Sequence, residues 1–430
     1  MKKIISSRLN EEYFVAEHPS GLKIFLYPKK NYSSSYAAFS VNYGSINNRY
    51  KLGSEIIEIP DGTAHFLEHK LFENKEGDAF NFFSEIGSSA NAGTSFDKTV
   101  YLFSCSSNNR EDCILEKSLV ILLDFVQNPY FTENGVNKER GIISQEIAMY
   151  QDSPSWKVLN NCLQSLYHNH PVKIDIVGSQ ETIKKITSKV LQGCYDYFYS
   201  PSNMNFCVVG NFEPEKILEI INKNIKFSTK NNCQNCLKDI MSPEPKEVVK
   251  KSVYEKMEII NPIFNLAFKE EMNQKNINLK ELIVSELALC ALMLKSGKMY
   301  NRLLDSELIS TSTFDSEYFT GPFYAASFFS GESRNPEKVA EIIREEASRI
   351  SNEGMDEDLF VTAKKIFCSE IISIFDNISA TANALVNFSF ANKEIFNFLD
   401  TLFEINLPEV NELLRNKFNA EHSTLSVISL

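Results

Sequence analysis

The spacing of apolar residues along the chain changes between a period of two and a period near 3.6. Residues 22 to 46 alternate as two paired strands would, and Gly44 with the polar residues after it ends that pattern. Residues 113 to 127 and 137 to 151 instead carry apolar positions at helical spacing. Strands followed by helices predict a sheet with helices packed on it.

The second half of the chain follows a similar plan. Residues 253 to 269 are predicted as strands, and residues 279 to about 304 as helices. Two later segments also resemble two earlier ones, 312–319 resembling 95–99 and 324–330 resembling 100–104. These similarities indicate a faint internal repeat.

A polar stretch that ends in Ser-Pro-Glu-Pro separates the two halves. We therefore expect a first domain over 1–225, a linker over 226–247 and a second domain over 248–430. Cys233 and Cys236 lie in this stretch at a spacing typical of metal or redox pairs. No second pair has that spacing and no strand precedes it, so a plain linker is favoured.

Composition agrees with two domains and excludes some classes of protein. The chain has 430 residues, 43% of them hydrophobic, which is enough for two cores. A net charge of −12 argues against a nucleic-acid partner. No apolar run approaches the roughly 18 residues of a membrane helix, and the N-terminus lacks the apolar stretch of a signal peptide. Nine cysteines, an odd number, favour a reducing compartment, and we expect a cytoplasmic protein.

Residues 65 to 69 read His-Phe-Leu-Glu-His, a pattern with the chemistry of a zinc hydrolase. On a helix that starts near Thr63, His65 and His69 project from one face and can share a metal ion. Catalytic zinc takes three protein ligands and leaves one position for water, so a third ligand must come from elsewhere. Glu146 is the candidate, which leaves Glu68 to act as base.

The five-residue motif is the inverse of the commoner HExxH helix and occurs by chance in many sequences. Only six histidines are present, however, and two of them fall in this motif. The alternative is a pair of satisfied core histidines. That alternative is disfavoured, because burying two imidazoles and a carboxylate without a metal ion would be costly.

The segments around this motif resemble the insulinase/pitrilysin family of zinc metallopeptidases, the inverzincins, which includes insulin-degrading enzyme and mitochondrial processing peptidase. The resemblance rests on 61–72, 87–95, Glu139 with Glu146, His170-Pro171, 178–183 and 199–210. It implies an α+β fold of two similar domains, each a mostly antiparallel sheet packed with helices, related by an internal duplication. In the second half, 294–298 takes the place of the metal helix and offers no ligands, so one Zn²⁺ per chain is expected.

The implied activity is that of a zinc endopeptidase that hydrolyses peptides or short unfolded segments. Glu68 would take the proton of the zinc-bound water and pass it to the leaving amine. Glu139, two helical turns before Glu146, would orient a ligating histidine, the alternative being an ordinary solvated carboxylate. Ala90, Asn91 and Ala92 resemble the family's edge strand that pairs with an extended substrate, the alternative being an edge strand without that role.

One position pair departs from the family's pattern. Complete members carry, in the second half, an arginine and, seven residues later, a tyrosine that assist the transition state. Leu304 and Thr311 take their places here. Since short members of the family pair two chains, we expect a homologous partner that supplies both groups in a heterodimer. The alternative function is a non-catalytic subunit that acts as a scaffold or peptide binder.

Overall fold

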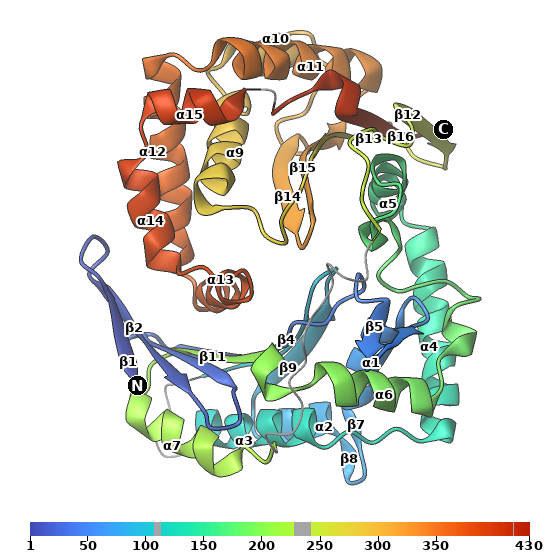
Figure 1. The fold of residues 1–430 in the computed structure, drawn as a ribbon, viewed down its shortest axis with the longest axis vertical. Coiled ribbons are helices and arrows are strands. Elements are labelled where there is room, and N and C mark those ends of the chain that lie inside the picture. Colours follow the sequence, from blue (N-terminus) through green and yellow to red (C-terminus); the bar gives the residue numbers. More distant parts are fainter. Residues whose placement is uncertain (107–112, 228–241, 416) are drawn as a thin grey trace. The chain divides into compact units, whose positions relative to one another are not determined.

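The computed structural model, which describes residues 1–106, 113–227, 242–415 and 417–430, contains two large sheets, each with its own helices (Figure 1). The chain forms two compact units. The first consists of Met1–Ile147, Asp175–Ile240 and Ile372–Phe396. The second consists of Ala148–Ile174, Met241–Ile371 and Asn397–Leu430. Each unit is thus assembled from segments that are distant in sequence.

The first unit is built on a seven-stranded sheet with the order β1-β2-β3-β11-β4-β10-β9. Its strands are β1 Lys2–Ser6, β2 Glu11–Glu17, β3 Lys23–Pro28, β4 Ser34–Val41, β9 Ser89–Thr94, β10 Thr99–Ser106 and β11 Met204–Gly210. Only β3 and β11 pair in parallel, and the other neighbours are antiparallel. Two small hairpins accompany it, β5 Arg49–Leu52 with β6 Glu55–Glu58 and β7 Glu73–Asn74 with β8 Gly77–Asp78. Among the residues that the structure describes, β9 is therefore an edge strand of the sheet.

Helices cover both faces of this sheet. They are α1 Thr63–Leu71, α2 Ala79–Glu85, α3 Ile114–Gln127, α4 Glu133–Gln151, α6 Ser188–Phe198, α7 Pro214–Asn224 and α13 Ile378–Phe390. In Figure 1, α2, α3 and α7 lie on one side of strands β4, β9 and β11, and α13 lies on the other side. Helix α3 buries Leu119, Leu122, Leu123 and Val126, a helical repeat that matches the predicted periodicity. The core lies between this stripe and β10, whose residues are alternately buried.

The second unit is built on a five-stranded sheet with the order β12-β16-β13-β15-β14. Its strands are β12 Ser252–Lys256, β13 Ile263–Glu270, β14 Asp315–Gly321, β15 Tyr324–Glu332 and β16 Ser423–Ser429. Its helices are α5 Pro154–Leu166, α9 Leu279–Leu292, α10 Lys298–Asp305, α11 Pro336–Glu353, α12 Glu357–Ile374, α14 Ile395–Glu404 and α15 Leu407–Leu414. Only β12 and β16 pair in parallel.

The two sheets repeat one topology, which confirms the predicted α+β fold with an internal duplication. The order β3-β11-β4-β10-β9 corresponds to β12-β16-β13-β15-β14, and each parallel or antiparallel pairing is the same in both. One helix of each half is exchanged. Helix α13 packs on β4 and β11 of the first sheet, and α5 packs on β13 and β16, the corresponding strands of the second.

This exchange bears on the predicted domain boundaries. A division of the chain into 1–225 and 248–430 separates the two sheets, but α5 and α13 each belong to the unit on the other side of that division. Both helices cover a sheet face that would otherwise expose apolar side chains. The predicted linker 226–247 stays a prediction, because 228–241, with Cys233 and Cys236, lies outside the described residues.

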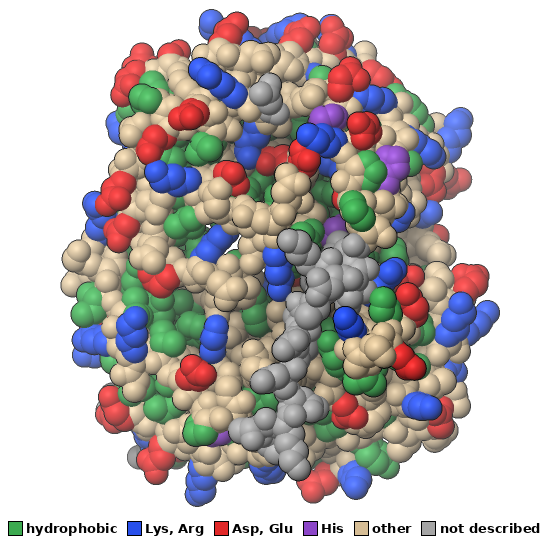
Figure 2. Space-filling view, viewed as in Figure 1, with side chains coloured by type: hydrophobic (Ala, Val, Ile, Leu, Met, Phe, Trp, Pro, Cys, Tyr) green, Lys and Arg blue, Asp and Glu red, His purple; other side chains and the backbone are tan. Residues whose placement is uncertain are grey.

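The described residues contain free cysteines and a surface of mixed charge. The seven cysteines within the described ranges are free thiols. No helix in the described part of the chain is long and apolar enough to cross a membrane. On the face drawn in Figure 2, basic and acidic side chains are interspersed. The expected cytoplasmic location stays a prediction.

His170, in the second unit, is a buried structural histidine. Its Nε2 lies 3.0 Å from the carbonyl oxygen of Pro322, and the backbone N–H of Val172 donates to its Nδ1 at 3.0 Å. Burial lowers the pKa of His170 to about 4, and the charge of Lys269 acts in the same direction. The hydrogen bond to Pro322 and the charge of Glu244 oppose the shift without cancelling it. His170 is therefore neutral in the folded protein near neutral pH.

We expect acid to destabilise the second unit through His170. Between pH 6.5, the ordinary value for histidine, and pH 4, the unfolded chain binds a proton there that the folded chain does not. The free energy of unfolding therefore decreases as the pH is lowered, by about 2 kcal/mol between pH 6.5 and pH 5. The His170→Gln variant should melt lower than wild type at pH 7 but lose less on acidification to pH 5. Equal losses in thermal midpoint for the two proteins would contradict this role.

Candidate metal centre

Two close backbone approaches fix the start of α1, the helix that carries the motif. Gly62 has φ +89° and Gly178 has φ +75°, values that favour glycine. A Cβ on Gly62 would lie 2.5 Å from the carbonyl oxygen of Val177, and one on Gly178 would lie 2.5 Å from that of Asp61. These two glycines thus let the loops before α1 and before α6 come into contact. This contact gives a structural reason for the glycine at position 178, in one of the segments on which the family resemblance rests.

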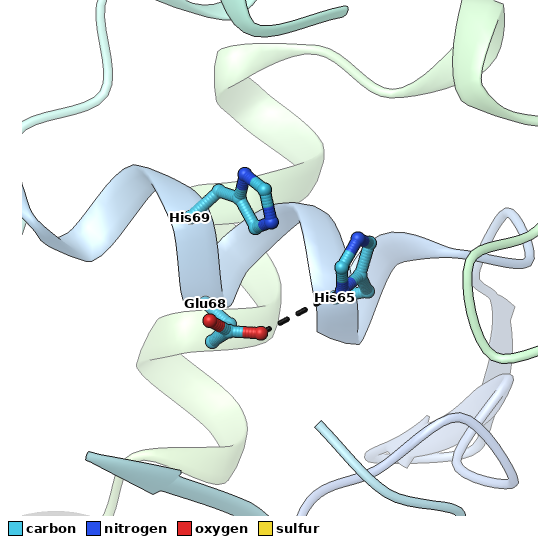
Figure 3. Close-up of side chains that lie close together, drawn as sticks. All are labelled: His65, Glu68 and His69. Atoms are coloured by element: carbon cyan, nitrogen blue, oxygen red, sulfur yellow. Dashed lines mark ion pairs between the residues drawn. The ribbon is translucent and has the colours of Figure 1, made fainter. Parts of the chain in front are cut away.

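His65 and His69 project from α1 with their rings 4.6 Å apart between centroids. Figure 3 shows both rings and the Glu68 carboxylate on neighbouring turns of this helix. Glu146, from α4, approaches both rings with one oxygen. Its Oε2 lies 3.0 Å from Nε2 of His65 and 3.6 Å from Nε2 of His69. The structure thus brings together the three residues that the sequence predicted as metal ligands.

Glu139 contacts the opposite side of the second ring. Its Oε1 lies 2.9 Å from Nδ1 of His69, and its side chain is only 15% exposed. A carboxylate on Nδ1 fixes the imidazole with its proton on that nitrogen, which leaves the Nε2 lone pair for a cation. Glu139 is therefore not a solvated helix carboxylate but a partner of the predicted ligand His69.

Glu68 lies on the Nδ1 side of His65, at 3.6 Å from Oε2 to Nδ1. The hydroxyl of Thr94 donates to the same oxygen at 3.1 Å. His65, Glu68 and His69 each offer one possible metal-ligand atom, and these three atoms lie within 4.8 Å of one another. Glu146, however, is the carboxylate that faces the Nε2 atoms of both histidines, so the geometry favours Glu146 over Glu68 as third ligand.

The carboxylates dominate the electrostatics of this cluster. Burial lowers the pKa of His65, but the hydrogen bonds and charges of Glu146 and Glu68 outweigh that effect and raise it to about 9. Without a metal ion His65 is therefore protonated at neutral pH. Binding of a divalent cation at Nε2 has to displace that proton, so metal uptake releases protons.

The donor set fits zinc. Two imidazole nitrogens and one carboxylate oxygen are the ligands of many catalytic zinc sites, with bonds of about 2.0–2.2 Å. In a tetrahedral arrangement such bonds hold ligand atoms about 3.3 Å apart, between the 3.0 and 3.6 Å found here. The residues present thus offer three ligands of suitable chemistry, and Glu146 lies at a suitable distance from both histidines.

The predicted substrate strand is the edge strand β9, which packs against α1. Ala90 and Ala92 are half-buried and alternate with the exposed Asn91. The backbone N–H of Ala92 donates to Oδ1 of Asn91 at 2.9 Å, so the asparagine side chain satisfies an amide of the edge. Thr94, at the end of this strand, is the residue that contacts Glu68.

Comparison with known proteins shows the family. The model of the insulinase family, peptidase family M16, matches residues 24–180, and that of the M16 inactive domain matches residues 185–367. The uncharacterized zinc protease YmfH of Bacillus subtilis is 35% identical over 431 residues, which cover 99% of this chain and 98% of that protein. The chain belongs to peptidase family M16. The resemblance seen in the sequence is thereby confirmed.

Other M16 relatives match in structure or over shorter stretches. A putative M16-like peptidase from Alicyclobacillus acidocaldarius superposes with a TM-score of 0.91 at 29% identity, covering 99% of this chain and 100% of that one. A probable mitochondrial-processing peptidase subunit beta of Arabidopsis thaliana is 29% identical over 167 residues, 38% of this chain and 30% of that protein. These M16 proteins support a peptidase-family role for this chain.

The second M16 domain lacks the metal motif at the corresponding place. Of the residues predicted to replace the metal helix, 294–297 lie between α9 and α10, and Lys298 is the first residue of α10. Leu304 lies on α10 with 39% of its surface exposed, and Thr311 is exposed in the loop before β14. Neither side chain can supply a cation or a phenol.

Proposed function

We propose that this chain is a zinc-dependent endopeptidase that hydrolyses peptides or short unfolded segments. The observation that carries the proposal is the position of one Glu146 oxygen between the Nε2 atoms of His65 and His69, at 3.0 and 3.6 Å. These three residues would hold one Zn²⁺, and Glu139 would hold the ring of His69 in place. The zinc protease names of the M16 relatives support the choice of metal.

The bound ion would lower the pKa of a coordinated water and polarise the scissile carbonyl. Glu68 accepts the proton of the attacking water and delivers it to the leaving nitrogen. The Glu68 side chain is only 11% exposed, so little bulk water contacts its carboxylate. The placement of Glu68 beside His65 but on the Nδ1 side leaves it free for this role while the Nε2 atoms hold the ion.

An extended peptide would add to β9 as a further strand of the sheet. The edge position of β9 in the described sheet and the small side chains of Ala90 and Ala92 support this, since they let a second backbone approach. The Asn91 side chain would then release the N–H of Ala92 to a carbonyl of the peptide. Recognition through backbone groups favours unfolded segments over folded proteins.

The test of the proposed function is hydrolysis of an internally quenched peptide by the purified chain with one equivalent of zinc. We expect cleavage at internal bonds, its loss on chelation and its return when zinc is restored. Cleavage that is unaffected by chelation would refute the zinc mechanism. Peptide binding without cleavage, alone and with related chains, would favour the alternative of a non-catalytic peptide-binding subunit.

We also propose that a homologous chain completes the catalytic site. Family members that carry an arginine and a tyrosine in the second half use them to stabilise charge on the carbonyl oxygen, and this chain has Leu304 and Thr311 in their places. Loss of one such group commonly lowers the rate by about a hundredfold. A partner that carries both groups would therefore form a heterodimer with this zinc-binding chain.

A mixing experiment tests the partner. We expect the isolated chain to cleave peptides slowly, and addition of a related chain bearing the Arg and Tyr to raise kcat/KM by about a hundredfold. The matched control is the same partner with its arginine replaced by leucine. If the chain alone, shown by sedimentation to be a monomer or homodimer, cleaves as fast as every mixture, the heterodimer proposal is wrong.

A further inference from the structure

Thr94 is the last residue of β9, and its side chain contacts the carboxylate of Glu68 from the sheet. The Thr94 hydroxyl donates to Glu68 Oε2 at 3.1 Å, and the same oxygen lies 3.6 Å from Nδ1 of His65. Among the residues that the structure describes, no hydrogen bond engages Oε1 of Glu68. One carboxylate oxygen is therefore held in place, and the other keeps its lone pairs for proton transfer.

The backbone around Thr94 is held on both sides. Thr94 pairs with Thr99 at the end of the β9–β10 hairpin. The carbonyl oxygen of Ser95, the next residue, accepts a hydrogen bond from the N–H of Ser45 at 3.1 Å, and Ser95 N–H donates to the carbonyl of Lys98 at 2.8 Å. A side chain anchored on such a turn can hold its partner in one orientation.

We propose that Thr94 is a positioning residue that fixes the orientation of the Glu68 carboxylate. The inference rests on the proposed role of Glu68 as base. It adds a link between two parts of the site, since Thr94 belongs to the strand with which the peptide would pair. The peptide backbone and the base are thereby aligned through a single strand and a single hydrogen bond.

Two replacements at Thr94 separate positioning from packing. Thr94→Val keeps the branched shape and removes the hydroxyl, whereas Thr94→Ser keeps the hydroxyl. We expect Thr94→Val to lower kcat about tenfold, the scale on which loss of an outer partner affects such sites, with KM within twofold of wild type and full zinc content. The Thr94→Ser variant should retain most of the wild-type kcat.

The matched control is Thr99→Val, which removes the hydroxyl of the paired residue. That hydroxyl donates to the carbonyl of Tyr43 at 2.8 Å and does not contact Glu68. We expect the Thr99→Val variant to keep kcat near wild type. The proposed role of Thr94 is overturned if Thr94→Val keeps the wild-type kcat, if Thr94→Val changes only KM, or if Thr99→Val lowers kcat as much as Thr94→Val does.

A structural measurement keeps this inference separate from the proposed function. In crystals of the zinc-loaded proteins, we expect one orientation of the Glu68 carboxylate in wild type and a changed or divided one in Thr94→Val. An unchanged single orientation overturns the role of Thr94 even if the protein proves inactive. A wild-type protein that cleaves no peptide, with or without partner, refutes the proposed function alone.

Discussion

The purified protein is expected to hold about one zinc ion per chain, and His65→Ala, His69→Ala and Glu146→Gln are each expected to abolish that binding. The reason is geometric. One oxygen of Glu146 faces the Nε2 atoms of both histidines, so each change removes one of only three donors. Two remaining protein ligands are too few to hold the ion in a catalytic site. Elemental analysis after dialysis against metal-free buffer measures the effect directly.

Two matched variants test the assignment more sharply. Glu139→Gln removes the carboxylate from Nδ1 of His69 without removing a donor, so zinc should bind with about 10- to 100-fold lower affinity. His18→Ala removes a histidine whose Nδ1 contacts Ser20 and not the metal site, so it should keep full stoichiometry. Zinc retained at one equivalent in all three ligand variants would refute the ligand assignment.

The elements that position the site could be predicted from the sequence because their patterns are local. Helices α3 and α4 were predicted from apolar residues at helical spacing. Strands β3 and β4 were predicted as a paired, alternating stretch, and both form, but they are buried on both faces and do not alternate. The exchange of α5 and α13 could not be predicted in this way. An amphipathic helix shows that it buries one face, but the sequence does not show which sheet face is left open to receive it.

The metal ligands show the same division between local and non-local information. His65 and His69 share a face because they are four residues apart on one helix, which the sequence states directly. Glu146 was the candidate for the third ligand because zinc needs one more donor, and the family resemblance supported it, but the side of the rings that it faces became visible only in the structure. The contact of Thr94 with Glu68 had no local signal, because it depends on how β9 packs against α1.

Replacement of Glu68 by glutamine is expected to leave zinc binding and folding intact and to reduce peptide hydrolysis by a factor on the order of 10² to 10⁴. Glutamine has nearly the same shape and can still contact Thr94 and His65, but its amide can neither accept the water's proton nor deliver it to the leaving nitrogen. Peptide affinity should therefore stay close to wild type, since β9 and its edge are unchanged.

The matched control is Glu85→Gln, the same chemical change at an exposed position at the end of α2. Zinc content, peptide affinity and kcat measured on both variants decide whether Glu68 is the base. A Glu68→Gln protein that cleaves at a rate near that of Glu85→Gln rules out Glu68 as the base. A Glu68→Gln protein that has lost its zinc shows instead that Glu68 is one of the metal ligands.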